Sequence, residues 1–186
     1  MRNVTVSNFV SLDGFFAGPG GEIDWFVWDD ETAAYMHGLM SSLDTMLFGR
    51  VTYELMASYW PTAGPPAEDP IITDFMNKTP KIVFSRTLKK VEWNNSRLVR
   101  DNVAGEVSKM KGTSGRDMVI FGSGSIVSAF AQTGLIDDYR IFVNPVVLGE
   151  GKTMFRGLKE RLKLKLLSTK TFRCGVVLLH YEPERK

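Results

Sequence analysis

The sequence predicts an α/β fold: a three-layer sandwich whose central sheet is mostly parallel, with an antiparallel hairpin at its C-terminal end. Short apolar runs rich in β-branched residues alternate with stretches whose apolar residues recur at helical spacing. This alternation is typical of a parallel sheet covered by helices. The last two strand-like stretches follow each other with no helix between them, which favours a hairpin.

Composition narrows the class of protein. We expect one domain over residues 1–186, because the chain has an ordinary domain length. The net charge of +2 gives no reason to expect a nucleic-acid or anionic membrane partner. No apolar run approaches the ~20 residues that span a bilayer. A single cysteine, Cys174, excludes an internal disulfide and indicates a cytoplasmic protein, and with only two histidines we expect no metal site.

The first half of the chain alternates strands and helices. Strands are expected at residues 4–12, 45–48 and 81–84, and helices after the acidic cluster 29–31, at 51–59 and around 72–76. The acids can begin a helix by capping, and its apolar face would be Met36, Leu39, Met40 and Leu43. Residues 15–21 and the proline-rich 61–70 read as loops. Phe15 and Phe16 either cover a flat ligand or turn into the core.

The second half follows the same plan until its end. A short strand is expected within 91–99, a helix over 103–110 after Asn102, a buried strand at 118–121 and a helix from 126 that Gly134 ends. A strand at 139–143 precedes the turn 149–151. The alternating run 162–166 predicts a half-buried strand, and 172–181 its return partner, with a bend at Cys174 and Gly175.

The glycine-rich turn between residues 122 and 125 is the strongest candidate for a binding site. It follows a buried strand and precedes a helix, an order that directs free backbone N–H groups and the positive end of a helix dipole at one point. Taken alone, a run such as Gly122-Ser123-Gly124 is more often an ordinary turn, and it lacks the third glycine of a dinucleotide fingerprint.

Two other predicted strands end in groups that suit the same ligand. The strand at 45–48 leads to Gly49-Arg50-Val51-Thr52, and the strand at 81–84 leads to Ser85-Arg86-Thr87. Ligands of open α/β sheets bind at the carboxyl ends of strands. Glycine, arginine and hydroxyl groups at three such ends predict a cradle for a multiply phosphorylated nucleotide.

The ordered set of these motifs resembles the dihydrofolate reductase fold and, more closely, the C-terminal reductase domain of the bifunctional riboflavin-pathway deaminase/reductase. The matching runs extend over nearly the whole chain: residues 11–14, 48–54, 84–87, 120–124, 134–138 and 145–149. The resemblance implies NADPH as hydride donor and a small heterocycle as substrate, as for 5-amino-6-(5-phosphoribosylamino)uracil reductase or dihydrofolate reductase. Together with the strands near 139–148 and 172–181, it also favours a homodimer.

The resemblance further implies roles for particular residues. Gly49, Arg50 and Thr52 would hold the 2′-phosphate and pyrophosphate side of NADPH, Ser85 and Arg86 would lie by the adenosine, and Val10 and Phe121 would flank the nicotinamide. The pyrophosphate would rest on Gly122, Ser123, Gly124 and Ser125. In place of the family's run around the first tryptophan, this chain has Ile23-Asp24-Trp25, so the resemblance implies a reductase without naming its substrate.

Three aspartates and an apolar lid complete the predicted substrate side. Asp30 lies five residues after Trp25 and either binds or protonates a heterocycle or only begins the helix. Asp13 is a second candidate for proton transfer. Asp24, Trp25 and Phe16 are candidates for substrate contact, the last two as an apolar lid. Two functions therefore stay open: an NADPH-dependent reductase, and a non-catalytic nucleotide-binding module that retains the cradle.

Overall fold

The computed structural model describes residues 1–184 and confirms the predicted α/β architecture. An eight-stranded sheet has the order β5-β4-β3-β6-β1-β7-β10-β9. Every pairing from β5 to β7 is parallel, and only the two pairings of β10, with β7 and β9, are antiparallel. The prediction of a mostly parallel sheet with a C-terminal hairpin is therefore correct.

The elements have the following bounds. The strands are β1 (Val4–Val10), β2 (Phe15–Ala17), β3 (Leu43–Gly49), β4 (Lys81–Phe84), β5 (Ser96–Val99), β6 (Asp117–Ile120), β7 (Asp138–Val143), β8 (Lys152–Thr153), β9 (Leu164–Thr171) and β10 (Val177–Pro183). The helices are α1 (Asp30–Ser41), α2 (Arg50–Tyr59), α3 (Pro70–Lys78), α4 (Val103–Lys111) and α5 (Gly124–Gln132). None of these helices is long and apolar enough to cross a membrane.

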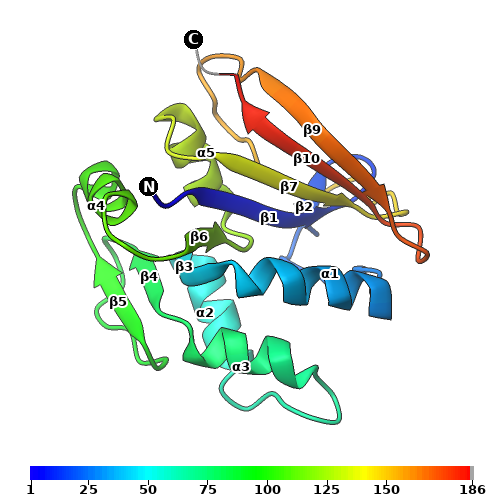
Figure 1. Cartoon of the computed structure of the whole chain (residues 1–186), viewed down its shortest axis with the longest axis horizontal. Coiled ribbons are helices and arrows are strands. Elements are labelled where there is room, and N and C mark those ends of the chain that lie inside the picture. The colour runs from blue at the N-terminus through cyan, green and yellow to red at the C-terminus, as the bar shows by residue number, and fades with distance from the viewer. Residues whose placement is uncertain (185–186) are drawn as a thin grey trace.

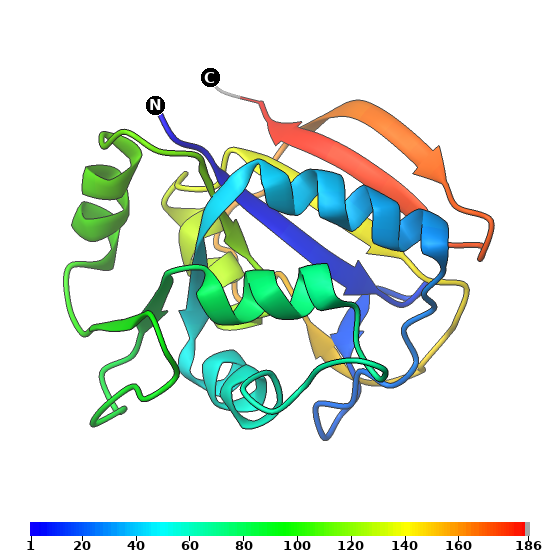
Figure 2. The same ribbon diagram turned by 60° about the horizontal axis from the view of Figure 1, so that its bottom comes forward.

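Helices cover both faces of the sheet and divide the core in two. On one face α4 and α5 bury Val107, Met110 and Phe130 against Val4, Val6 and Ile120. On the other face α1, α2 and α3 bury Met36, Tyr53 and Ile72 against Met46, Phe48 and Phe142. Figures 1 and 2 show α1, α2 and α3 together on one side of the sheet and α4 and α5 on the other. The three layers follow from the near-continuous apolar runs of the central strands, which need cover on both faces.

Four local predictions need correction. Leu43 belongs to β3 and not to the face of α1, because that helix ends at Ser41. Residues 15–17 form β2, which pairs antiparallel with β8, although the glycines nearby read as a loop. Residues 91–93 lie outside β5. Residues 172–176 form the connection of the last hairpin, so Cys174 and Gly175 lie in its turn and the register shift falls at His180 and Tyr181.

Two capping predictions also change in detail. Asp29, not Asp30, caps α1, with its carboxylate accepting hydrogen bonds from the N–H and hydroxyl of Thr32, both at 2.8 Å. Asn102 does precede α4, but its side chain accepts no capping hydrogen bond and its backbone is left-handed, with φ of 50°. Gly134 follows α5 with φ of +66°, as a helix-ending glycine should.

The outer strand β9 is more exposed than its alternating sequence predicts. Leu166 is 50% exposed and Leu167 is 44% exposed, and they lie where the pairing register between β9 and β10 shifts, opposite His180 and Tyr181. The alternation of Leu and Lys indicated one buried face. It failed because β9 is the last strand of the sheet, and no helix within residues 1–184 covers it.

A buried lysine at the start of β4 connects this strand to the segments on either side of it in the sequence. Lys81 is fully buried, and its ammonium group donates to the carbonyl oxygens of Asn77 (3.1 Å), Thr79 (2.8 Å) and Asn94 (3.1 Å). The same nitrogen lies 4.3 Å from the centre of the Trp93 ring, a cation–π contact. These bonds join the end of α3 to the segment before β5. Burial lowers the pKa of Lys81 to about 8.

We predict that Lys81→Met lowers the free energy of unfolding by about 1–3 kcal/mol, because three inward-facing carbonyl groups lose their donor. Chemical denaturation at pH 7 measures the change. Lys78→Met is the matched control, because Lys78 is 75% exposed and pairs only with Asp74. An equal loss in both variants would contradict the role of Lys81.

The pH dependence gives a second readout of the same residue. Between pH 8 and 10.5 the unfolded chain keeps a proton on Lys81 that the folded chain has released, so unfolding becomes less favourable as pH rises through this window. The stability of the unmodified protein should therefore rise relative to Lys81→Met from pH 8 to pH 10.

Candidate functional site

The candidate site forms where β3 and β6 end and two helices begin. Gly49 ends β3 and directly precedes α2, while β6 ends at Ile120 and Gly124 begins α5. The two strands are parallel neighbours, so both helix N-termini lie at the same edge of the sheet. The first N–H groups of a helix have no partner within it and, with the helix dipole, attract an anion.

Three hydrogen bonds hold these helix starts together. The Gly49 N–H donates to Ser123 Oγ at 2.9 Å, and the Ser123 N–H donates to Thr52 Oγ1 at 2.9 Å. The Gly122 N–H donates to Asn8 Oδ1 at 2.6 Å. The five residues involved come from β1, β3, α2 and the 122–125 turn, so three neighbouring elements hold the turn in place.

These hydrogen bonds give the predicted turn residues different roles. Ser123 and Thr52 are buried and use their hydroxyl groups within the protein. Ser125 is exposed, and the N–H groups that remain for a ligand are those at the start of α5 and α2. The turn can thus bind a phosphate through Gly124, Ser125 and the start of α2, with Ser123 and Thr52 supporting it from beneath.

Glycine is required at two positions for different reasons. Gly122 has φ of +67°, which other residues rarely adopt, and a Cβ there would lie 3.1 Å from Thr52 Cγ2. A Cβ on Gly124 would lie 2.7 Å from the Phe16 ring. Because the obstruction comes from Phe16, a substitution at Gly124 disturbs the packing of β2 before it reaches any ligand.

The two predicted arginines are exposed, and each makes one surface ion pair. Arg50 pairs with Glu54 at 2.9 Å, one helical turn along α2, and both side chains are 47% exposed. Arg86 pairs with Asp101 at 3.3 Å and is more exposed still. Ser85 accepts from the N–H groups of Thr87 and Leu88 and so shapes the turn after β4. Surface pairs of this kind contribute little to stability and can be exchanged for a ligand phosphate.

The two predicted proton-transfer residues differ. Asp13 accepts from the Ser11 hydroxyl at 2.6 Å and from the N–H groups of Gly149 (2.8 Å) and Leu148 (3.2 Å). These bonds, the one from Ser11 foremost, lower the pKa of Asp13, so it remains a carboxylate and braces two turns. Asp30 is exposed at the start of α1 and makes no hydrogen bond or ion pair within residues 1–184.

Two of the predicted substrate-contact residues, Phe16 and Trp25, are partly buried. Phe16 on β2 lies against the start of α5 and packs on the core of that face. Trp25 is partly buried, donates to the Glu22 carbonyl at 3.0 Å and meets Phe26 edge to face at 4.5 Å. Asp24 is exposed. Val10, 6% exposed, and the partly buried Phe121 pack into opposite cores, and Phe121 also meets the Phe75 ring of α3.

Two asparagines that the sequence reading missed organise this end of the sheet. Asn8 is 3% exposed on β1 and holds Gly122, and Asn144 is fully buried. Asn144 accepts from the Val27 N–H at 2.9 Å and donates to the Val10 carbonyl at 3.4 Å. The available signal was an amide side chain inside, or just after, an apolar strand, since a buried amide needs internal partners.

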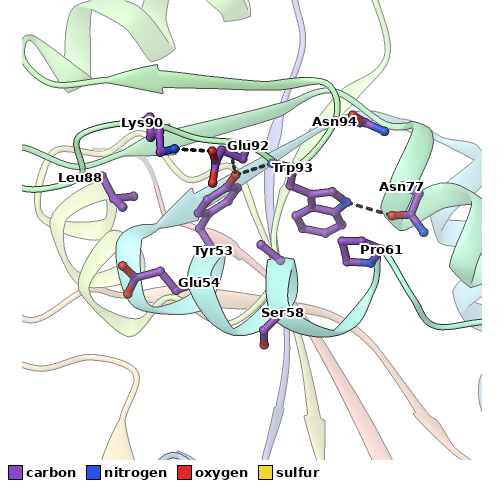
Figure 3. A pocket seen from close by; sticks show the side chains of 11 residues that line it. Tyr53, Glu54, Ser58, Pro61, Asn77, Leu88, Lys90, Glu92, Trp93 and Asn94 are labelled. Atoms are coloured by element: carbon purple, nitrogen blue, oxygen red, sulfur yellow. Dashed lines mark hydrogen bonds and ion pairs between the residues drawn. The ribbon is translucent and has the colours of Figure 1, made fainter.

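A separate hollow of about 580 Å³ lies between α2 and the segment before β5. Figure 3 shows Tyr53, Glu54 and Ser58 of α2 on one side and Lys90, Glu92 and Trp93 on the other. The Tyr53 hydroxyl accepts from the N–H groups of Glu92 and Trp93, both at 3.0 Å, and Trp93 donates to Asn77 at 2.9 Å. None of the predicted site residues lines this hollow. Residues 1–184 also contain no group of three metal-ligating side chains.

We predict that Thr52→Val lowers the free energy of unfolding by about 1–3 kcal/mol, because it leaves the buried Ser123 N–H without an acceptor while keeping the side-chain shape. Thermal and urea unfolding measure the loss. Ser125→Ala is the control, because that hydroxyl is exposed and unbonded within residues 1–184. If Thr52→Val unfolds like the unmodified protein, the bond to Ser123 does not hold the turn.

Comparisons with known proteins agree with this geometry. The chain is 35% identical over 180 residues to the uncharacterized protein YyaP of Bacillus subtilis (strain 168), covering 97% of this chain and 94% of that protein. A putative riboflavin biosynthesis protein from Shewanella sp. PV-4 has a similar structure, with a TM-score of 0.77 at 22% identity over the whole of both chains. Dihydrofolate reductase from Enterococcus faecalis, complexed with NADP(H), has a TM-score of 0.65 at 12% identity, covering 98% of this chain and 97% of its own.

These solved structures establish that the fold is of the dihydrofolate reductase type. The family model described as the RibD C-terminal domain matches residues 2–178, which include every strand pairing of the parallel sheet and the whole 122–125 turn. The chain therefore belongs to the RibD C-terminal domain family.

Proposed function

We propose that this protein is an NADPH-dependent reductase that transfers hydride to a small heterocyclic substrate in the cytoplasm. The observation that carries the proposal is the pair of helix N-termini, α2 and α5, held side by side by Ser123 and Thr52 at the carboxyl edge of the sheet. Such a pair suits a pyrophosphate, and the adjacent Arg50 suits a further phosphate. The membership of the RibD C-terminal domain family supports a reductase of this kind.

The residues present fit this cofactor. Gly124, Ser125 and the start of α2 would bind the pyrophosphate, Arg50 the 2′-phosphate, and Ser85 and Arg86 the adenosine side. NADPH would supply the hydride when bound. Val10 and Phe121 would lie beside its nicotinamide, and Phe16 and Trp25 would exclude water from the acceptor.

The proton, where the acceptor needs one, is assigned to Asp30. Asp13 is occupied by three hydrogen bonds that hold it as a carboxylate. Asp30 is not committed to capping, because Asp29 caps α1, so its carboxyl is free to orient or protonate a substrate.

The test has two stages. NADPH should quench the tryptophan fluorescence of the protein with a saturable titration, and the bound NADPH should then be oxidised by at least one member of a panel of pterins, flavin precursors and quinoid compounds. Binding without consumption by any of them would favour the second function, a nucleotide-binding module that has lost its chemistry. Absence of NADPH binding would overturn both.

We predict that Arg50→Ala weakens NADPH binding at least tenfold and leaves NADH binding nearly unchanged. A charge-assisted bond to the 2′-phosphate contributes about 1.5–3 kcal/mol, roughly a 10- to 150-fold preference for NADPH. Parallel fluorescence titrations with the two cofactors measure the ratio. Glu54→Gln is the matched control, since it breaks the same 2.9 Å pair but keeps the arginine, and it should preserve or raise NADPH affinity. If Arg50→Ala weakens the binding of NADPH and NADH equally, Arg50 does not bind the 2′-phosphate, and Arg86 becomes the candidate.

We further propose that the protein is a homodimer that pairs through β9. An outer strand with two exposed leucines presents unpaired backbone groups and apolar surface, which a second copy would cover. Leu166→Lys combined with Leu167→Lys should give a monomer in analytical ultracentrifugation, while Ile71→Lys, which alters another exposed apolar residue on α3, should not. A dimer that survives the double change would place the interface elsewhere.

A further inference from the structure

The part of the chain that borders the substrate side of the candidate site has an unusual charge. Residues 3–49 contain seven carboxylates and not one lysine or arginine, although the whole chain has 23 basic residues. Six of the seven lie between Asp13 and Glu31. We call residues 13–31 the acidic segment.

The acidic segment is fixed to the carboxyl end of β1. Its Phe16 lies against Gly124 at the start of α5. Its Val27 N–H is held by Asn144, which also bonds the Val10 carbonyl at the last residue of β1. Figure 2 shows the loop after β2 and the helix α2 along the same edge of the molecule. The segment therefore lies next to the 122–125 turn, on the side where a hydride acceptor would bind.

Most of its carboxylates already have partners within the protein, although only Glu31 is paired with cations. Asp13 and Asp29 accept hydrogen bonds from backbone N–H groups and hydroxyls, and Glu22 accepts from the Gly20 N–H. Glu31 pairs with Lys170 at 3.0 Å and Arg173 at 3.7 Å. Asp24 and Asp30 are exposed and have no partner within residues 1–184.

The surface between these two carboxylates is aromatic. Trp25 and Phe26 meet edge to face, and Phe9 of β1 stacks on Phe26 at 5.0 Å and lies 5.7 Å from Trp28. Trp28 remains 43% exposed. On α2, which starts at the turn, Val51, Leu55 and Tyr59 recur every four residues and are 60%, 46% and 48% exposed. A flat apolar ring suits such surroundings.

Few cations could offset the free carboxylates. Lys170 and Arg173 are committed to Glu31. Lys152 on β8 lies beside the segment, close to Gly21, and its side chain has no ion pair within residues 1–184. Arg50 is the group assigned to the cofactor. A phosphate on the substrate would thus meet two unpaired carboxylates and one uncommitted cation, Lys152, so the like charges on balance repel it.

From these observations we infer that the substrate is a planar heterocycle without a phosphate group, either neutral or positively charged. This inference rests on the proposed reductase function and narrows it, because it separates the protein from reductases whose substrate carries a phosphoribosyl group. Asp24 and Asp30 act as the residues that exclude anionic substrates, while the aromatic side chains bind the ring.

The experiment compares matched pairs that differ only by a phosphate: riboflavin with flavin mononucleotide, pyridoxal with pyridoxal 5′-phosphate, and ribitylaminouracil with its 5′-phosphate. Dissociation constants for the protein saturated with NADP⁺ are measured by calorimetry. At least one phosphate-free ring should bind, and at least tenfold more tightly than its phosphorylated partner. Tighter binding of any phosphorylated member, or no binding by all three phosphate-free compounds, would overturn the inference.

Charge variants test the assigned residues. Asp24→Asn combined with Asp30→Asn should reduce the tenfold discrimination, measured as the ratio of the two dissociation constants, to less than threefold. Asp74→Asn combined with Glu160→Gln makes the same change of charge on exposed residues outside the acidic segment and should leave the discrimination intact. If the two double variants reduce the discrimination equally, the net charge of the protein determines it, and the acidic segment does not.

Failure of the proposed function can be told apart from failure of this inference. NADPH binding is titrated first, and its absence would count against the reductase proposal alone. The matched pairs would then be measured on the cofactor-free protein, where the charge of the acidic segment is the same.

Discussion

The organising interaction of this protein is the set of three hydrogen bonds that fixes the 122–125 turn. Asn8 holds Gly122, Thr52 holds Ser123, and Ser123 holds Gly49, so β1, β3, α2 and α5 converge on four residues. The N–H groups of Gly49 and Ser123 would otherwise be buried without a partner, which is costly. Because these bonds consume the inward-facing N–H groups, the outward-facing ones at the helix starts are left free and pre-positioned for an anion.

The fold was predictable because local patterns and global topology agree over most of the chain. Apolar strands such as 118–120 and a helix ended by Gly134 carry their own signals. The predictions failed where the bounds or burial of an element depend on the strands that lie beside it in the sheet. Leu43 continues the apolar face of α1 in sequence, but it starts β3 because it pairs with Asp117 of β6. The exposure of β9 depends on its position at the sheet edge, which no local pattern records.

The site was predictable in its backbone and not in its side-chain bonding. Glycines and strand ends point to the turn, since their role is local geometry. Spacing cannot reveal that Thr52 reaches Ser123, or that Asn8 reaches Gly122 across 114 positions of sequence. Likewise the choice between Asp29 and Asp30 as the cap of α1 depends on which carboxylate meets the Thr32 N–H. That choice leaves Asp30 free, and its freedom is what makes it a candidate for substrate contact.

Stability and recognition are assigned to different residues throughout this edge of the sheet. The groups that hold the turn, Ser123, Thr52 and Asn8, are all less than 10% exposed. The groups proposed to meet ligands, Arg50, Ser125 and Asp30, are exposed and either unbonded within residues 1–184 or held by one surface pair. Surface pairs such as Arg50 with Glu54 contribute at most about 1 kcal/mol, so a ligand phosphate can displace them without weakening the fold. The separation allows the exposed charges to change, and with them the preferred substrate, while the buried bonds keep the turn in place.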